Sequence, residues 1–270
     1  MRIVKHSRFP NGLPDHRESP EEEYHVIIRT RSSVKGFYKA NEAQYSDWVQ
    51  VLTAEAPLHL DAPMVSLPPA DTGLLDLPLH QVIARRRSER SYGARPLSKI
   101  ELGTLLTLAN GVREVLRPSA ATVAYRRYVP SSGNLGAVEI YPVVLRVEGI
   151  DPGIYHFDTI GHHLAQVSPG YFESWLREAV LFQPELAEAA LVLVLTSAFG
   201  RLKAKYGPRG YKLGVLDAGH VSQNVYLIAT ALGLNVCSTA GFIDERLDAA
   251  LSLDGLDTAA SLVMAIGARP

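Results

Sequence analysis

The chain has 270 residues, 47% of them hydrophobic and 20% charged, which is ordinary for a globular protein with a sizeable core. Its 27 basic and 28 acidic residues give a formal net charge of −1, so no overall field draws it to nucleic acid or to a membrane surface. No apolar run reaches the roughly 18 residues that span a bilayer, and the first residues lack the apolar core of a signal peptide, which together predict a cytoplasmic protein.

Residues 1–76 are predicted to form an N-terminal extension that is partly irregular. Seven prolines between positions 10 and 69 interrupt regular structure there. Residues 24–30 contain enough β-branched side chains for a strand or an extended arm, and residues 43–53 suit a short helix. We therefore expect this extension to lean on the main body or on a second copy of the chain.

Regular periodicity begins after residue 77. A capping box from Ser98 to Glu101 predicts the start of a helix that ends at Gly111. The run at 189–196 is nearly all apolar, which is typical of a strand covered on both faces. Because helices and strands follow one another without strict alternation, residues 77–270 are predicted to form one α+β domain with helices on a central sheet. The expected helices cover 79–86, 98–110, 171–182, a long segment after 211, and 244–251; the expected strands cover 138–147, 153–158, 163–167, 189–196, 235–238 and 261–266.

Several common catalytic motifs are missing from the sequence. No phosphate-binding loop is present and no glycine-rich dinucleotide motif follows a strand, so an ordinary nucleotide-binding domain is not supported. There is no H-E-x-x-H helix and no G-x-S-x-G turn, and the adjacent His162 and His163 diverge in a turn. The single cysteine, Cys237, excludes an internal disulfide and is interpreted as a small buried residue of a strand. The sequence thus predicts no metal site.

Four polar clusters remain as candidates for chemistry. The first is a run of arginines around Ser88, which is either a solvated basic face or a phosphate site, because guanidinium groups bind phosphate oxygens in pairs. The second is the turn at 131–134, whose small residues either only turn the chain or let a flat ligand approach the backbone. The third is a polar loop in which Lys205 and Tyr206 either lie on the surface or transfer protons. The fourth is the small-residue turn at 240–242.

The long helix that follows the polar loop carries Asp217, His220 and Asn224 at i, i+3 and i+7, as one polar stripe on an otherwise apolar rod. Buried packing at a contact between two subunits is the simpler interpretation of this stripe, and direct catalysis is the alternative. The helix itself is expected to be central and buried.

Three short motifs resemble the flavin-binding segments of the nitroreductase superfamily: RRRSERSY at 85–92, PSSGN at 130–134 and AGF at 240–242. The longer stretch KYGPRGYKLGVLDAGHVSQN at 205–224 is more specific. It resembles the SagB-type dehydrogenases, or azoline oxidases, of ribosomal peptide biosynthesis. The resemblance covers roughly residues 78–270, and the motifs follow one another in the same order.

This resemblance implies a nitroreductase-like α+β fold, with a mostly antiparallel central sheet flanked by helices, and an interlocked homodimer that binds FMN at the subunit interface. It also implies roles for individual residues. Lys205 and Tyr206 match the pair assigned to catalysis in the azoline oxidases. The residues that match FMN-binding positions are Arg86, Arg87, Ser88 and Arg90 for the phosphate and ribityl chain, Ser131, Ser132, Gly133 and Asn134 beside the isoalloxazine ring, Ala240 and Gly241 near its N5 atom, and Arg269 as a further phosphate contact.

The implied function is the FMN-dependent oxidation of thiazoline or oxazoline rings to thiazole or oxazole in a ribosomally made peptide natural product. Flavin N5 takes the hydride, and Lys205 or Tyr206 takes the proton. The implied partners are a second copy of the chain and the peptide substrate, and a complex with a cyclodehydratase is left open.

Two alternatives to the oxidase stay open. One is an NAD(P)H-dependent reductase of nitro, quinone or enone compounds. The other is a flavin-bearing scaffold subunit of a peptide-modifying synthetase, without catalysis of its own. Ala240 stands where the nitroreductases proper place an acidic residue, which argues against the plain reductase.

Overall fold

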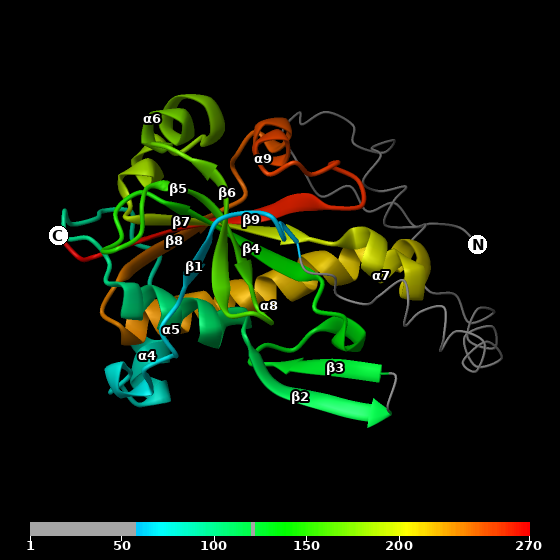
Figure 1. The fold of residues 1–270 in the computed structure, drawn as a ribbon. Helices are drawn as coiled ribbons and strands as arrows, with labels where there is room; N and C mark the ends of the chain where they lie inside the picture. Colours follow the sequence, from blue (N-terminus) through cyan, green and yellow to red (C-terminus); the bar gives the residue numbers. More distant parts are fainter. Residues whose placement is uncertain (1–57, 120–121) are drawn as a thin grey trace, which may run out of the picture. The chain divides into compact units, whose positions relative to one another are not determined.

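A seven-stranded sheet forms the centre of the computed structural model, which describes residues 58–119 and 122–270 (Figure 1). Its strands are β1 (Met64–Ser66), β4 (Val138–Val144), β5 (Gly153–Asp158), β6 (His163–Pro169), β7 (Leu191–Ser197), β8 (Asn235–Thr239) and β9 (Ala259–Gly267). They lie in the order β1-β6-β5-β4-β7-β9-β8, and every neighbouring pair is antiparallel. The predicted strand at 24–30 and helix at 43–53 lie outside the described residues.

The interior strand β7 is buried along its whole length. It pairs with β4 on one side and with β9 on the other. A strand without a solvated face has to be apolar on both faces, which is why this segment is nearly all leucine and valine. The predicted strand at 189–196 is therefore confirmed, although β7 starts two residues later.

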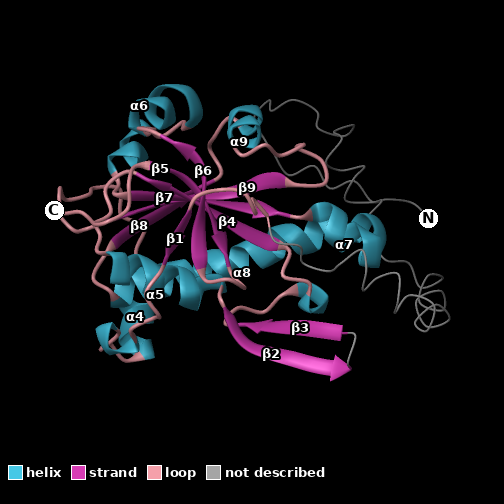
Figure 2. Cartoon of the chain, viewed as in Figure 1, coloured by secondary structure: helices cyan, strands magenta, loops and turns pink. Residues whose placement is uncertain are grey.

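Helices cover both faces of the sheet (Figures 1 and 2). They are α4 (Leu79–Arg85), α5 (Lys99–Asn110), α6 (Glu173–Trp175), α7 (Phe199–Tyr206), α8 (Gly210–Ala231) and α9 (Asp244–Ala250). Helices α5 and α8 lie on one face, and α6 and α9 lie on the other, with a large buried apolar cluster on each side. The predicted α+β fold, with an antiparallel sheet between helices, is confirmed. Short 3₁₀ turns occur at Thr72–Leu74, Ser132–Asn134, Pro184–Glu188 and Gly207–Arg209, and a π-helical turn occurs at Leu176–Val180.

Helix α8 has 22 residues and packs against the sheet, α5 and α7. Its length follows from an unbroken run of residues without proline. Among the described residues, neither α8 nor any other helix combines the length and apolar character needed to cross a membrane.

Helix α5 begins at the predicted capping box. The Ser98 hydroxyl accepts a hydrogen bond from the Glu101 amide at 3.2 Å, and the Glu101 carboxylate accepts one from the Ser98 amide at 2.7 Å. The helix ends at Gly111, whose φ of −65° is not left-handed. A Cβ at this position would lie 2.5 Å from the Thr107 carbonyl oxygen, so glycine is needed here for space rather than for its φ.

The segment at 205–211 is helical rather than the expected loop. Helix α7 continues through Lys205 and Tyr206 and stops at Gly207, whose φ of +59° favours glycine. The 3₁₀ turn Gly207–Arg209 then leads directly into α8. Periodicity does not reveal α7, because only two of its eight residues are buried.

Two other helices differ in detail from the expected ranges. The helix expected at 244–251 forms as α9 and ends at Ala250; Ile243 is its N-cap, and Asp244 lies in the first turn, where a carboxylate interacts favourably with the helix dipole. The helix expected at 171–182 is shorter, because the chain leaves helical geometry at Leu181 to form a β-bridge with Phe242.

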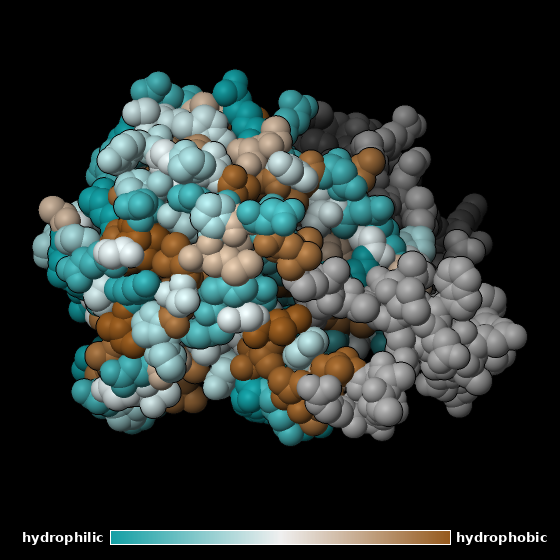
Figure 3. Space-filling model, in the orientation of Figure 1, coloured by the Kyte–Doolittle hydropathy of each residue, from teal (hydrophilic) through white to brown (hydrophobic). Residues whose placement is uncertain are grey.

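A separate two-stranded hairpin, β2 (Val112–Ser119) and β3 (Thr122–Arg127), was not expected from the sequence. It stands apart from the main sheet (Figure 2). Val115 and Val123 are 51% and 43% exposed, and hydrophobic residues are visible over this part of the surface (Figure 3). A two-stranded ribbon has little stability of its own. Since β2 and β3 mix charged and apolar residues, no clear alternation marks them as strands.

Replacing Ser98 by alanine should lower the free energy of unfolding by about 1 kcal/mol, because the Glu101 amide loses its acceptor. Urea denaturation followed by circular dichroism measures the change. Ser174→Ala, at an exposed position of α6, is the matched control and should change the free energy by less than about 0.5 kcal/mol. Equal values for the two variants would contradict the capping role.

Candidate functional site

The turn at residues 131–136 is held by a buried carboxylate. Asp217, on α8, is 3% exposed. Its two oxygens accept hydrogen bonds from the amide and the hydroxyl of Ser132, both at 2.8 Å, and one oxygen lies 3.4 Å from the Ser131 hydroxyl. A buried carboxylate needs such donors to offset its desolvation. Helix α8 therefore determines where this turn lies.

Lys205 and Tyr206 lie against the same turn. Gly133 has a φ of +62°, and a Cβ there would collide with the Tyr206 hydroxyl and lie 3.0 Å from the Lys205 Nζ. The Lys205 Nζ is also 5.6 Å from the centroid of the Tyr206 ring. The structure thus brings together two of the clusters noted in the sequence, the Lys-Tyr pair and the Ser-Ser-Gly-Asn turn.

The surroundings of Tyr206 raise the pKa of its phenol above the ordinary value. Burial, which disfavours the phenolate, is the larger cause, and the negative charge of Asp217 adds to it. The Tyr206 hydroxyl therefore keeps its proton at neutral pH and enters the site as a hydrogen-bond donor.

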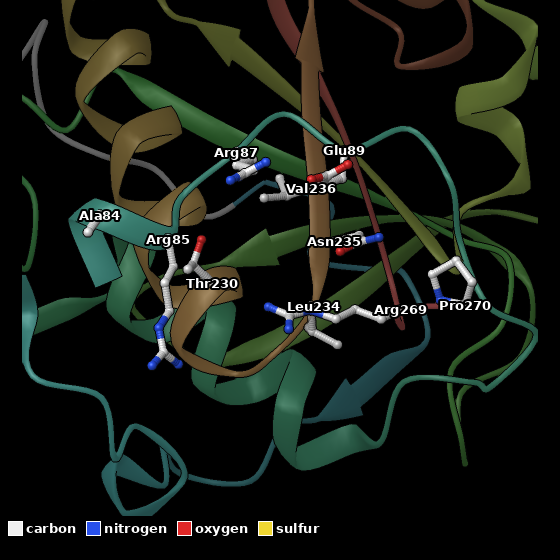
Figure 4. Close-up of a pocket in the computed structure, with 10 residues that line it drawn as sticks. All are labelled: Ala84, Arg85, Arg87, Glu89, Thr230, Leu234, Asn235, Val236, Arg269 and Pro270. Carbon is white, nitrogen blue, oxygen red and sulfur yellow. The ribbon is translucent and has the colours of Figure 1, made fainter. Parts of the chain in front are cut away.

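A cavity of about 480 Å³ lies where residues 85–90, called here the arginine segment, meet the end of β9 (Figure 4). Arg87 enters it from the segment after α4, and Arg269 reaches across β8 from the other side. Within the described residues, neither arginine has a carboxylate at ion-pair distance. The cavity therefore carries excess positive charge and suits an anion. The rest of its lining is Ala84, Arg85, Glu89, Thr230, Leu234, Asn235, Val236 and Pro270.

Tyr226, on α8, anchors the rest of the arginine segment. Its hydroxyl lies 2.9 Å from the Ser88 hydroxyl and accepts a hydrogen bond from the Ser238 amide at 2.8 Å. The Arg86 guanidinium lies over the tyrosine ring, 5.4 Å from its centroid. Ser88 and Arg86 thus contact Tyr226 instead of lining the cavity, and Arg90 is an exposed residue outside the lining.

The turn at Ala240 and Gly241 lies at the far end of β8 from this cavity. Asn235 lines the cavity, and five residues of extended strand put Ala240 about 17 Å from it. The Gly241 carbonyl accepts a hydrogen bond from the Phe182 amide at 3.0 Å, and the Gly241 amide donates to the Thr239 hydroxyl at 2.9 Å. The turn is therefore held from both sides while Ala240 stays exposed.

Within one chain the predicted site residues do not all meet; two groups, each with several of them, lie well apart, and the Ala240–Gly241 turn lies away from the cavity. The Lys-Tyr pair and the 131–136 turn gather beside Asp217. The arginine-lined cavity includes Thr230, thirteen positions further along α8. At 1.5 Å per residue the two groups are roughly 20 Å apart along the helix axis.

The expected polar stripe of α8 does not form one surface. Asp217 is bonded to the turn, and the Asn224 amide lies 3.4 Å from a carbonyl oxygen in the last turn of α5. His220 is exposed. The helix is also not buried all round, since Val215 and Leu216 are 46% and 50% exposed. Two of the three stripe residues therefore have partners within the chain, and the expected contact between subunits stays a prediction.

Sequence reasoning missed several residues because their roles depend on tertiary contacts. Thr230 and Asn235 line the cavity, and Tyr226 organises the arginine segment. Only Tyr226 had a local signal: a phenol on a buried helix face requires a hydrogen-bond partner. Asp217 was noticed in the sequence, but its partner was not.

Cys237 is buried in β8, and burial raises the pKa of its thiol. The interpretation of this residue as a small buried strand residue is confirmed, and its raised pKa makes it a poor nucleophile. In the part of the chain that the structure describes, no three His, Cys, Asp or Glu side chains are arranged to bind a metal ion.

The sheet order and its two helical layers are those of the nitroreductase fold. A nitroreductase-like protein from Anabaena variabilis aligns with 80% of this chain and 45% of its own, with a TM-score of 0.65 and 24% identity. A chain of the Escherichia coli microcin synthetase McbBCD complex, solved with truncated pro-MccB17 bound, aligns with 93% of this chain and 92% of its own, with a TM-score of 0.56 and 20% identity. At these identities, both structural similarities show a shared fold and do not show a shared activity.

The family model described as "Nitroreductase family" matches residues 83–268. The chain therefore belongs to the nitroreductase family of flavin-dependent oxidoreductases.

Curated relatives include both a nitroreductase and peptide-processing proteins. The nitroreductase-like protein MJ1384 of Methanocaldococcus jannaschii is 33% identical over 172 residues, or 64% of this chain and 83% of that protein. The trifolitoxin-processing protein TfxB of Rhizobium leguminosarum is 29% identical over 56% of this chain and 42% of its own length. The microcin B17-processing protein McbC of Escherichia coli is 28% identical over 53% of this chain and 54% of its own length. The chain thus spans about half of the two peptide-processing relatives.

Replacing Gly133 by alanine should displace Tyr206 and Lys205 from the turn. The matched control is Gly149→Ala, because Gly149 also has a positive φ, +70°, but a Cβ there would meet nothing within 4 Å. Both substitutions should lower the free energy of unfolding by about 1–2 kcal/mol through the left-handed backbone. Only Gly133→Ala should speed the acetylation of Lys205 by acetic anhydride, measured by peptide mass spectrometry. Equal acetylation rates in the two variants would argue against the contact.

Proposed function

We propose that the protein is a SagB-type azoline oxidase, which converts thiazoline or oxazoline rings of a ribosomally made peptide into thiazole or oxazole with FMN as cofactor. The observation that carries the proposal is the contact of Lys205 and Tyr206 with Gly133 in the 131–136 turn. TfxB and McbC support it, because their names describe the processing of trifolitoxin and microcin B17. Residues 77–270 are the proposed FMN-binding domain, and residues 1–76 the proposed extension.

The residues present fit FMN. Arg87 and Arg269 offer guanidinium groups to a phosphate, and the cavity lies within the usual range for ligand pockets, about 300–1,000 Å³. The turn at Ala240 is about 17 Å away along β8, so the two parts suit an elongated ligand with an anionic end. Bound FMN would supply a hydride acceptor at N5 that O₂ can reoxidise. The proposed FMN contacts are Arg86, Arg87, Ser88, Arg90, Ser131, Ser132, Gly133, Asn134, Ala240, Gly241 and Arg269.

The proposed roles of the Lys-Tyr pair follow from its surroundings. Aromatising an azoline removes a hydride and a proton from adjacent atoms, so a base is required. The Lys205 amine takes the proton from the ring carbon. Tyr206, which stays protonated because its pKa is raised, orients the amine or the substrate as a hydrogen-bond donor. Gly133 leaves space for both side chains beside the turn.

We also propose that two copies of the chain complete each site. The Lys-Tyr pair and the arginine-lined cavity are roughly 20 Å apart along α8, so a second copy would bring its own 131–136 turn to the first copy's cavity. Val215 and Leu216, half exposed on α8, offer apolar surface for this contact. The peptide substrate and a cyclodehydratase complex stay predictions.

The second candidate function is an NAD(P)H-dependent reductase, which the 33% identity to MJ1384 favours. Anaerobic addition of NAD(P)H distinguishes the two enzymes. Rapid bleaching of the bound flavin would support the reductase, and an unchanged spectrum would support an oxidase that is reduced by its substrate. A scaffold without catalysis predicts normal product formation when Lys205 and Tyr206 are both replaced.

Lys205→Ala should keep its FMN and lose about 100- to 10,000-fold in turnover of an azoline peptide, because a positioned base contributes this much. The loss of two hydrogens per ring, followed by mass spectrometry, measures turnover. Lys203→Ala is the matched control on the same helix, since Lys203 forms an exposed ion pair with Asp257 at 2.7 Å, and it should turn over like the wild type. Full turnover by flavin-loaded Lys205→Ala would refute the assignment of the base.

Arg269→Ala should weaken FMN binding about tenfold or more and leave riboflavin binding unchanged, because only FMN carries the phosphate. Quenching of flavin fluorescence measures both dissociation constants. Arg177→Ala is the control, since Arg177 pairs with Glu173 and Glu188 away from the cavity. Equal losses for FMN and riboflavin would mean that Arg269 does not contact the phosphate.

A further inference from the structure

The 131–136 turn is held from a second side by Arg201, on α7. The Arg201 Nη1 donates hydrogen bonds to the carbonyl oxygens of Gly136 at 2.8 Å and Leu135 at 3.3 Å. Asp217, on α8, accepts from donors in the first half of the same turn. A carboxylate thus holds the donors at one end of the turn, and a guanidinium holds the acceptors at the other.

Such support is needed because the backbone of the turn is unusual. Gly133, Asn134 and Gly136 all have positive φ. A segment with this geometry persists only where the surrounding structure holds it. The position of Gly133, which faces the Lys-Tyr pair, therefore depends on contacts from outside the turn.

Arg201 is itself held by a buried chain of polar groups. Glu139, in β4, places Oε1 3.5 Å from the Arg201 Nη1 and Oε2 3.3 Å from the His156 Nε2 in β5. The side chains of Arg201, Glu139 and His156 are 14%, 13% and 4% exposed. Little solvent screens the Arg201–Glu139 ion pair, so removing one member would leave the other charge unpaired in a largely buried place.

Helix α7 needs contacts with the rest of the chain to keep its position. The helix has eight residues, and a helix this short is not stable by itself. Arg201 and Lys205 are four residues apart, so they lie on the same face of α7, the face next to the turn. Lys203 lies on another face and pairs with Asp257. Phe199 and Leu202 of α7 are buried, and Leu202 packs against Leu135, so the Arg201 contact adds a polar restraint to this apolar packing beside Lys205 and Tyr206.

We infer that Arg201 is a positioning residue of the site: it locks the 131–136 turn onto α7, so that the Tyr206 hydroxyl and the Lys205 amine stay against Gly133. Glu139 and His156 act behind it by holding the guanidinium in place. The effect on turnover rests on the proposed function, whereas the effect on the turn does not.

Hydrogen exchange tests the effect on the turn in the full-length, flavin-loaded protein. In Arg201→Ala the amides of residues 132–136 should exchange at least about tenfold faster than in the wild type, because the carbonyl contacts are lost. Lys203→Ala, which removes an exposed ion pair of the same helix, should leave these rates unchanged. Unchanged exchange in Arg201→Ala would overturn the inference. If Arg201→Ala does not fold, Arg201→Met is used instead, since methionine keeps an aliphatic stem and loses the donors. Faster exchange in Arg201→Met would support the inference, and unchanged exchange would overturn it.

Turnover of an azoline peptide provides the second readout. Arg201→Ala should lower kcat by about 10- to 100-fold while KM and FMN content stay close to wild type, because a small displacement affects chemistry more than binding. Added guanidinium ion should restore part of kcat in Arg201→Ala and none in Lys205→Ala, since only the former leaves a guanidinium-sized space beside Gly136.

A parallel loss of FMN and turnover, with no rescue by guanidinium, would assign Arg201 a general structural role and overturn the positioning. If the wild-type protein does not oxidise azolines, the proposed function fails, and hydrogen exchange alone then decides whether Arg201 holds the turn.

Discussion

A buried carboxylate on the central helix determines where the 131–136 turn of the candidate site lies. Asp217 has almost no contact with solvent, and a charge in that position needs hydrogen-bond donors. The donors come from Ser132, 85 positions earlier in the chain, so these hydrogen bonds hold the 131–136 turn against α8. This contact leaves Gly133 facing Tyr206, and the charge of Asp217 contributes to the raised pKa of the tyrosine.

Helix α8 connects the two halves of the candidate site because it is long and packed on several sides. Its first half holds the turn through Asp217, and its second half holds the arginine segment through Tyr226 and the cavity through Thr230. The fold around it is shared by proteins that differ in activity, so the fold alone does not determine the reaction. The short helix α7 carries the residues that distinguish the proposed oxidase, and Arg201 joins this helix to the 131–136 turn.

The features that could be predicted were those with a local physical cause. The capping box at Ser98 involves residues three positions apart, and β7 is apolar because both its faces are covered. The family motifs indicated which polar residues are candidates for the site. In contrast, α7 and the β2–β3 hairpin were missed, because α7 is too short to establish a helical repeat and the ribbon mixes charged and apolar residues without clear alternation.

The sequence by itself therefore determined the fold class, the order of most elements and the polar clusters that are candidates for chemistry, because periodicity, capping and motif spacing act over a few residues. Only the tertiary structure decided which clusters meet. The contact of Tyr206 with Gly133, the pairing of Arg201 with Glu139, and the meeting of Arg87 and Arg269 at one cavity each join distant segments. Such contacts arise from the burial of charges and polar groups that need partners, and the partner of a buried group cannot be read from its neighbours in the chain.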